Sequence, residues 1–264
     1  MTKVIITGSG AAPGVPSLSK GWGKCDPNNE KNKRRRIGTY IEIGDQSFLI
    51  DTSPDLRMQL LDNNIRHIDA VLYTHSHADH LHGIDDLREL NRICGKAIDI
   101  FAIKETLDDI KNRFSYLIVD DTCDDKGVFK ASLKAHEIKE SEDFYLGNVK
   151  ISPLALEGHM VASVGYAFND GEIVYIADCK EILPKALDKI KVRPKLMIMP
   201  LTVIKSHYQK FYHMELDKLL EYVNLIKPER TIINHMAIEC DYDTVNNLTP
   251  SNVFPAYDNM VVEF

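Results

Sequence analysis

Short runs of β-branched and apolar residues alternate along the chain with segments in which apolar residues recur at helical spacing. The first pattern predicts strands over residues 3–7, 40–43, 48–50, 70–74, 98–103, 149–156, 164–168, 173–177, 196–199, 231–234 and 260–264. The second pattern predicts helices over residues 84–93, 105–114, 180–190 and 214–226. A turn at Gly44, between two of the strands, favours a hairpin there.

The order of these elements indicates the fold class. Strands lead and helices follow in each half of the chain, which is typical of an α/β protein. Several strands follow one another without a helix between them, so a purely parallel sheet is not required. Two packed sheets with helices outside satisfy both features. At 264 residues, the chain is expected to form one domain over residues 1–264.

The balance of charge limits the partners of the protein. Lys and Arg number 32 and Asp and Glu number 39, which gives a formal net charge of −7. This acidic balance argues against binding of nucleic acid through general electrostatics. A basic run over residues 31–36 is the local exception. Such runs are usually solvated faces, and the alternative is that this one steers a phosphorylated substrate.

The cysteines and the apolar runs indicate the compartment. Five cysteines without a C-x-x-C pair do not resemble a secreted disulfide framework and fit a reducing compartment. Apolar runs fall short of the roughly 18 residues that span a membrane. The N-terminus lacks the apolar core of a signal peptide. We therefore expect a cytoplasmic protein with no membrane partner.

The clearest chemical signal is the sequence THSHADHLHG at residues 74–83. It follows an expected strand directly, and side chains two residues apart on an extended chain face the same way, so His75 and His77 point together. Asp79 and His80 come as the chain turns into the next helix and can face the same cavity. Imidazole and carboxylate groups are ligands for zinc, manganese and iron, and four of them can serve two metals.

A pair of metals needs further ligands from other strand ends. Three candidates occur at the ends of expected strands, namely His159, Asp178 and His235. An isolated histidine in such a place is usually solvated or packed in a core. The same residues in register with an H-x-H-x-D-H cluster instead favour a metal centre.

H-x-H-x-D-H followed by His, Asp and His, over residues 75–235, resembles the metallo-β-lactamase superfamily. That resemblance implies an αββα sandwich of two mixed β-sheets with helices outside. Within the superfamily, the chain is most similar to the phosphoribosyl cyclic-phosphate phosphodiesterases (PhnP-like), which are related to the tRNA 3′-processing endonucleases. The segments that carry this likeness are GVPS at 14–17, CDP at 25–27, DTSPDLR at 51–57, HGIDDLR at 82–88 and PAYD at 255–258.

The resemblance implies a centre of two divalent transition-metal ions, zinc or manganese. Its ligands would be His75, His77 and His159 at one metal, Asp79, His80 and His235 at the other, and Asp178 as the bridge. Two dications roughly 3.5–4 Å apart stabilise a phosphoryl displacement and acidify a bridging water, whose hydroxide is the nucleophile. Asp79 is also expected among the catalytic groups. Asp51 is expected to orient a histidine ligand from behind, with a loop cap as the alternative.

His213 is the second catalytic residue that the resemblance implies. It opens the helix expected over residues 214–226, from which its ring would face the phosphate and protonate the leaving oxygen. A surface histidine at a helix start is the alternative, and His207 competes for the role. Glu215 stands where this branch often has a hydroxyl residue.

We therefore expect a dinuclear-metal phosphodiesterase that acts on a small, cyclic ribose phosphate-like diester. One alternative is a tRNA 3′-processing-type nuclease, which is disfavoured because we see no inserted tRNA-gripping arm. Another is a thioester or lactone hydrolase of the same fold, which has no need for His213. A non-catalytic metal-binding module is disfavoured by the complete ligand set. The expected partner is the small substrate, nucleic acid is disfavoured, and a homodimer is left open.

Overall fold

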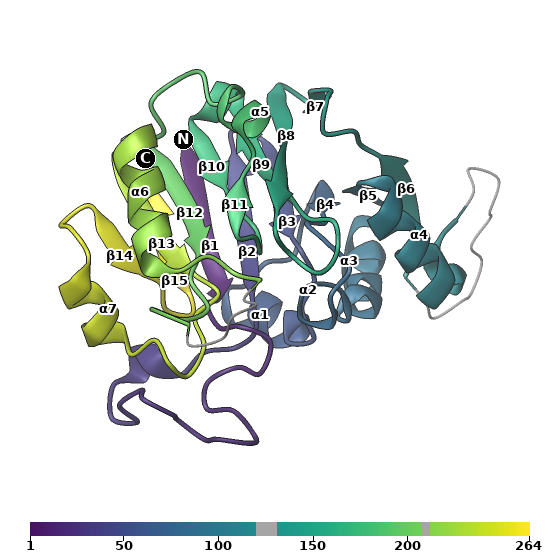
Figure 1. Ribbon diagram of the computed structural model, residues 1–264. Helices are drawn as coiled ribbons and strands as arrows, with labels where there is room; N and C mark the ends of the chain where they lie inside the picture. The colour runs from purple at the N-terminus through teal and green to yellow at the C-terminus, as the bar shows by residue number, and fades with distance from the viewer. Residues whose placement is uncertain (120–130, 207–211) are drawn as a thin grey trace.

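The computed structural model describes residues 1–119, 131–206 and 212–264, and its strands form two packed sheets (Figure 1). The first sheet has the order β15-β1-β2-β3-β4-β5-β6. Its strands are β1 (Thr2–Gly8), β2 (Gly38–Ile43), β3 (Gln46–Ile50), β4 (Ala70–Leu72), β5 (Ile98–Ala102), β6 (Leu133–Glu137) and β15 (Met260–Glu263).

The second sheet has the order β11-β8-β9-β10-β12-β13-β14, and β7 pairs with β8. Its strands are β7 (Phe144–Leu146), β8 (Val149–Glu157), β9 (Val164–Phe168), β10 (Ile173–Tyr175), β11 (Glu181–Ile182), β12 (Leu196–Pro200), β13 (Arg230–Asn234) and β14 (Val253–Pro255). In both sheets an antiparallel part leads into a parallel part, which begins at the β3–β4 pair in the first and at the β10–β12 pair in the second. The prediction of two mixed sheets is confirmed.

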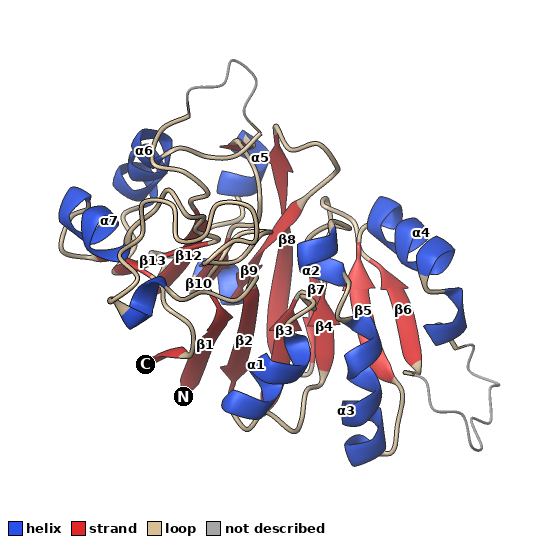
Figure 2. Ribbon diagram, turned by 90° about the horizontal axis from the view of Figure 1, so that it is seen from below, coloured by secondary structure: helices blue, strands red, loops and turns tan. Residues whose placement is uncertain are grey.

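Helices lie on the outer faces of the sheets (Figure 2). They are α1 (Leu56–Asp62), α2 (Ala78–Leu81), α3 (Leu87–Cys94), α4 (Lys104–Arg113), α5 (Pro184–Leu187), α6 (Leu216–Ile226) and α7 (Tyr242–Leu248). Four short 3₁₀ turns are described as well, at Glu30–Asn32, Ile84–Asp86, Ser115–Leu117 and Asn169–Gly171. None of the described helices is long and apolar enough to cross a membrane.

The alternation of side chains along each strand of the first sheet builds two separate cores. In β3, Phe48 and Ile50 face the second sheet and join the core between the sheets, whereas Leu49 faces α1–α4. β1 behaves in the same way, because its neighbouring residues also point to opposite faces. Each fully buried side chain of this size contributes about 1.5–3 kcal/mol through removal of apolar surface from water. The buried side chains therefore hold the strand ends in place, and the loops that follow the strands begin from these fixed positions.

One predicted helix is wrong in extent. Residues 180–190 were expected to be helical throughout, but Glu181–Ile182 forms β11, which pairs with the end of β8. The helix α5 begins only at Pro184, since proline lacks the amide hydrogen of a helix interior and disfavours a helical residue before it. The acidic residues 120, 121, 124 and 125 and His207 lie outside the described residues.

Within the basic run over residues 31–36, Lys31 and Lys33 are exposed, whereas the three arginines are neither a solvated face nor a free patch. Arg34 is only 2% exposed and donates to the carbonyl oxygen of Cys240 at 2.8 Å. Arg35 pairs with Asp62 at 2.6 Å, and Arg36 with Asp55 at 2.6 Å. These charges are used to fasten the long loop before β2 to its neighbours, so both sequence-based interpretations of the run were incomplete.

Candidate metal centre

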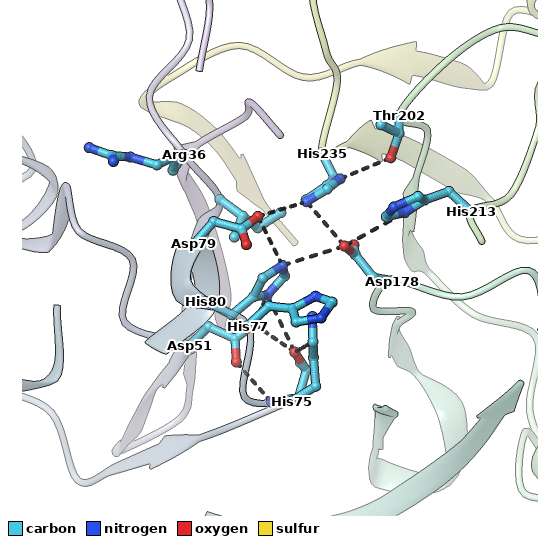
Figure 3. A network of polar contacts seen from close by, with 12 residues as sticks. Arg36, Asp51, His75, His77, Asp79, His80, Asp178, Thr202, His213 and His235 are labelled. Atoms are coloured by element: carbon cyan, nitrogen blue, oxygen red, sulfur yellow. Dashed lines mark hydrogen bonds and ion pairs between the residues drawn. The ribbon is translucent and has the colours of Figure 1, made fainter. Parts of the chain in front are cut away.

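The predicted ligands come from strand ends that meet at one edge of the two sheets. β4 leads into His75 and His77, and the four-residue helix α2 that follows carries Asp79 and His80. The other three residues come from the second sheet. They are His159 just after β8, Asp178 after β10 and His235 directly after β13. Figure 3 labels six of these seven residues, all but His159, and shows their side chains converging on one small volume.

The first group of donors is His75, His77 and His159, whose ligand atoms lie within 4.8 Å of one another. The Nδ1 atom of His77 is 3.0 Å from the Nε2 atom of His159. The ring of His75 meets those of His77 and His159 edge-on, at centroid distances of 4.8 and 4.9 Å. These are the three residues that were assigned to one metal.

The second group is Asp79, His80 and His235, again within 4.8 Å. The Asp79 Oδ2 atom lies 3.3 Å from His235 Nε2 and 3.5 Å from His80 Nε2. All three side chains are buried. The geometry thus brings together both predicted sets of donors.

Asp178 lies between the groups. Its Oδ2 atom is 3.6 Å from His80 Nε2 and 3.2 Å from His235 Nε2 (Figure 3). It also belongs to a set of three donors with His75 and His80. A carboxylate in this place can contact cations on both sides, as the bridging assignment requires.

Behind the first donors lies a buried hydrogen-bond network around Asp51. Its carboxylate accepts from His80 Nδ1 at 2.7 Å and from the amide and hydroxyl of Thr74 at 2.8 Å each. The Thr74 oxygen in turn accepts from His75 Nδ1 at 2.9 Å. This chain places the Nδ1 hydrogen of both rings in the network, so in the neutral form of each ring the Nε2 lone pair points to the centre. Asp51 therefore lies where a residue that orients histidine ligands is expected.

Two residues of the centre have left-handed backbones. Asp51 has φ of 64° and His235 has φ of 57°, a region that residues other than glycine seldom occupy. Such conformations cost of order 1–3 kcal/mol and tend to persist at functional sites, where the surrounding structure holds them. Here the contacts of Asp51 with Thr74, and of His235 Nδ1 with the hydroxyl of Thr202 at 3.1 Å, hold the two turns.

The donor set fits divalent metal ions. The Nε2 atoms of His75 and His80 are buried and have no hydrogen-bond partner among the described residues. An unsatisfied buried polar atom is costly, and a cation in the centre would satisfy both. Nitrogen and carboxylate oxygen donors suit zinc, manganese and iron.

Burial and neighbouring carboxylates act in opposite directions on the pKa values of His75 and His80. Burial lowers the pKa of His75 well below its ordinary value. Burial alone would also lower the pKa of His80, but the carboxylates of Asp79, Asp51 and Asp178 outweigh it and raise that pKa. For Asp178, burial opposes ionisation, while His235 and His80 hold its pKa well below the usual range.

His213 lies at the open side of the centre. Its Nδ1 atom is 3.7 Å from Asp178 Oδ2, and its ring stacks on that of His235 at 5.8 Å. Burial lowers its pKa to about 4, against the opposing effect of Asp178. His213 does not open the helix, because α6 begins at Leu216; it lies in the turn before it. Since it also forms a group of donors with His159 and Asp178, the geometry admits a ligand role besides the expected catalytic one.

Other supporting residues carried little signal in the sequence. Glu215 accepts a hydrogen bond from the Ser206 amide at 2.9 Å and so ties the segment after β12 to the start of α6. Tyr212 offers its carbonyl oxygen to His159 Nδ1 at 3.3 Å. Thr202 was not predicted, because nothing in the sequence pairs it with a histidine 33 positions away.

Comparison with known proteins agrees with this geometry. A sequence profile described as the beta-lactamase superfamily domain matches residues 46–236, so the chain belongs to that superfamily, among hydrolases of the metallo-β-lactamase fold. The crystal structure of a diphosphatase from the PhnP family is 26% identical, with a TM-score of 0.84 over 100% of this chain and 98% of that one. The short form of human tRNase Z shares the fold at 18% identity and a TM-score of 0.66, over 99% of this chain and 98% of that one.

One relative is named as a transferase rather than as a phosphatase or nuclease. An octanoyltransferase from Porphyromonas gingivalis is 28% identical over an alignment of 264 positions, which covers 98% of this chain and 51% of the octanoyltransferase. The chain therefore spans about half the length of that relative.

Proposed function

We propose that the protein is a metal-dependent hydrolase that cleaves a P–O bond in a small phosphodiester, of the cyclic ribose phosphate kind, or in a diphosphate. The observation that carries the proposal is the position of Asp178, between two groups of three donors and opposite His213. The likeness to a PhnP-family diphosphatase supports phosphate chemistry. Zinc or manganese is the proposed metal, and the cysteine pattern supports the cytoplasm as compartment.

In this proposal the residues of the centre have different functions. Two divalent cations held there would polarise phosphoryl oxygens and acidify the attacking water. Asp79 and Asp178 would supply negative charge to balance that of the cations. Asp51 keeps His80 in the tautomer that presents Nε2. His213 lies outside the two groups of three. With its pKa lowered to about 4, its neutral ring would donate a hydrogen bond to the phosphate, and it would give a proton to the leaving oxygen only where the bound phosphate raises that pKa.

A second candidate is hydrolysis of an acyl thioester. It is favoured by the name of the Porphyromonas gingivalis relative, which the chain matches over half of its length. The same centre could polarise a thioester carbonyl, and one fold of this kind can serve several reactions.

A substrate panel on metal-reconstituted protein decides between the candidates. Cyclic ribose phosphates, bis(p-nitrophenyl) phosphate, a nucleoside diphosphate, an octanoyl thioester and precursor tRNA would be compared at one salt concentration. We expect the small phosphate esters or the diphosphate to have the highest kcat/KM. Precursor tRNA should be a poor substrate with a shallow salt dependence, because few phosphates are neutralised. Preferred cleavage of the thioester, or efficient tRNA cleavage, would reject the proposal.

A further inference from the structure

Ser76, between the donors His75 and His77, is held by one face of α4. Its hydroxyl donates to Asp109 Oδ2 at 2.5 Å, and its carbonyl oxygen accepts from Arg113 Nη2 at 2.7 Å. Asp109 and Arg113 are four positions apart on the helix and also pair with each other at 3.2 Å. The hydroxyl and the carbonyl oxygen of this loop residue are therefore both held from the same helix.

The same arginine also reaches the other end of the donor loop. Its Nη1 atom lies 3.2 Å from Nε2 of His82, the residue that ends α2. Because arginine can only donate, this contact requires the neutral His82 ring to accept at Nε2. The ring of His82 also packs edge-on against Phe114, at 5.8 Å. Arg113 thus spans the segment that carries Asp79 and His80.

His77 is the histidine donor that needs such support. The rings of His75, His80, His159 and His235 each have an orienting partner, in Thr74, Asp51, the Tyr212 carbonyl and Thr202 respectively. Within the described part of the chain, the ring of His77 has a hydrogen-bond partner only in His159, which faces the same centre. His77 is also less buried than His75. Its orientation must therefore be set through its backbone.

We propose that Asp109 and Arg113 are positioning residues that set the orientation of His77 by clamping the backbone and side chain of Ser76. This inference rests on the proposed metal centre. According to this inference, α4 helps to set how tightly a metal binds at the position formed by His75, His77 and His159. Residues behind metal ligands typically change metal affinity by about 10–100-fold when they are removed.

The test measures metal binding directly. Metal-free wild-type protein, Asp109→Asn and Arg113→Lys would be titrated with Zn²⁺ against a competing chelator, and both dissociation constants would be fitted. Asp108→Asn is the matched control, since the neighbouring Asp108 pairs with Lys104 at 2.7 Å on the exposed side of the same helix. We expect one of the two sites to weaken by about 10–100-fold in the first two variants. The other site in Asp109→Asn, both sites in the control variant and the melting temperature of the metal-free protein should stay unchanged.

A double-mutant cycle identifies the site. In a His77→Ala background, Asp109→Asn should cause no further loss of Zn²⁺ affinity, because the ring that it positions is absent. Equal weakening of both sites together with a lower melting temperature would make α4 a purely structural support and overturn the inference. Unchanged affinities in both variants would overturn it as well. If the wild-type protein itself binds no pair of ions, the failure lies with the proposed metal centre.

Discussion

In one half of the candidate centre the donors occupy a single loop after β4, whereas in the other half they come from three separate strand ends. The first half is bound to the interior through Asp51 and Thr74, and His75 and His80 are at most 1% exposed. Beside the second half lies His213, whose side chain is 23% exposed. We therefore call the loop after β4, with its network behind His75 and His80, the firm half, and the strand-end donors, with His213 beside them, the open half.

The largest loss of metal and activity should follow from two single variants, each of which removes one donor from one of the halves. His80→Ala deletes the buried ring that contacts both Asp79 and Asp178, and Asp178→Ala deletes the carboxylate between the two groups. The two-metal arrangement implies about two ions per chain in the wild-type protein. Elemental analysis should show fewer ions in both variants. Phosphodiester turnover should fall by on the order of 1,000-fold or more, since the metals supply several kcal/mol to the transition state.

Full metal occupancy in either variant would remove that residue from the ligand set. A drop in turnover with unchanged occupancy in only one of them would show that the two halves are not both needed to hold the ions. Circular dichroism and a melting curve of the metal-free variants are the controls for folding.

These two halves also differ in how far the sequence predicts them. The H-x-H-x-D-H loop is recognisable because its donors are adjacent, and the two-residue period of an extended chain gives their direction. His159, Asp178 and His235 could be proposed only because each follows a strand, since the ends of neighbouring strands meet at one edge of a sheet. The structure brings all seven together, while their role as ligands stays a prediction.

What the sequence could not predict is the support from distant residues. Asp109 and Arg113 lie 33 and 37 positions from Ser76, and no local pattern links them. Arg34 was expected in a polar surface loop, yet it is buried against Cys240, because its guanidinium finds carbonyl acceptors in the segment after His235. Contacts of this kind depend on tertiary packing, so they become visible only in the folded chain.

A smaller effect is expected from His213→Ala, which alters the open half alone. The ring lies outside both groups of three donors, so the variant should keep its metal and its melting temperature. Loss of a general acid or of a hydrogen bond to the phosphate lowers kcat by about 100-fold or more on an alkyl diester. The loss should be smaller on a p-nitrophenyl ester, whose leaving group needs less protonation.

Two results would change this view of the open half. Near-normal turnover on the alkyl diester would make His213 a surface residue without a catalytic function. Loss of metal would make it a ligand with His159 and Asp178, which the geometry also admits.

The smallest effect concerns Asp55, a carboxylate outside the donor groups that pairs with Arg36. Asp55 lies four residues after Asp51 and accepts from Arg36 Nη2 at 2.6 Å and Nε at 2.9 Å. In Figure 3 the Arg36 side chain points away from the histidines. Burial alone would raise the pKa of Asp55, but the hydrogen bonds and charge of Arg36 outweigh it and lower that pKa below 3.8.

Asp55→Asn should therefore reduce stability without affecting metal content. The side chains of Arg36 and Asp55 are 35% and 24% exposed, so solvent screens their interaction. The free energy of unfolding should therefore fall by about 1 kcal/mol, which lowers the melting temperature by about 2–4 °C. Because the folded-state pKa is lowered, the wild-type advantage is present above the unfolded value near 3.8 and is lost as the pH falls through the folded value. Urea unfolding of both proteins at pH 7 and at about pH 3 checks this, and a difference that grows toward low pH would contradict the ion pair.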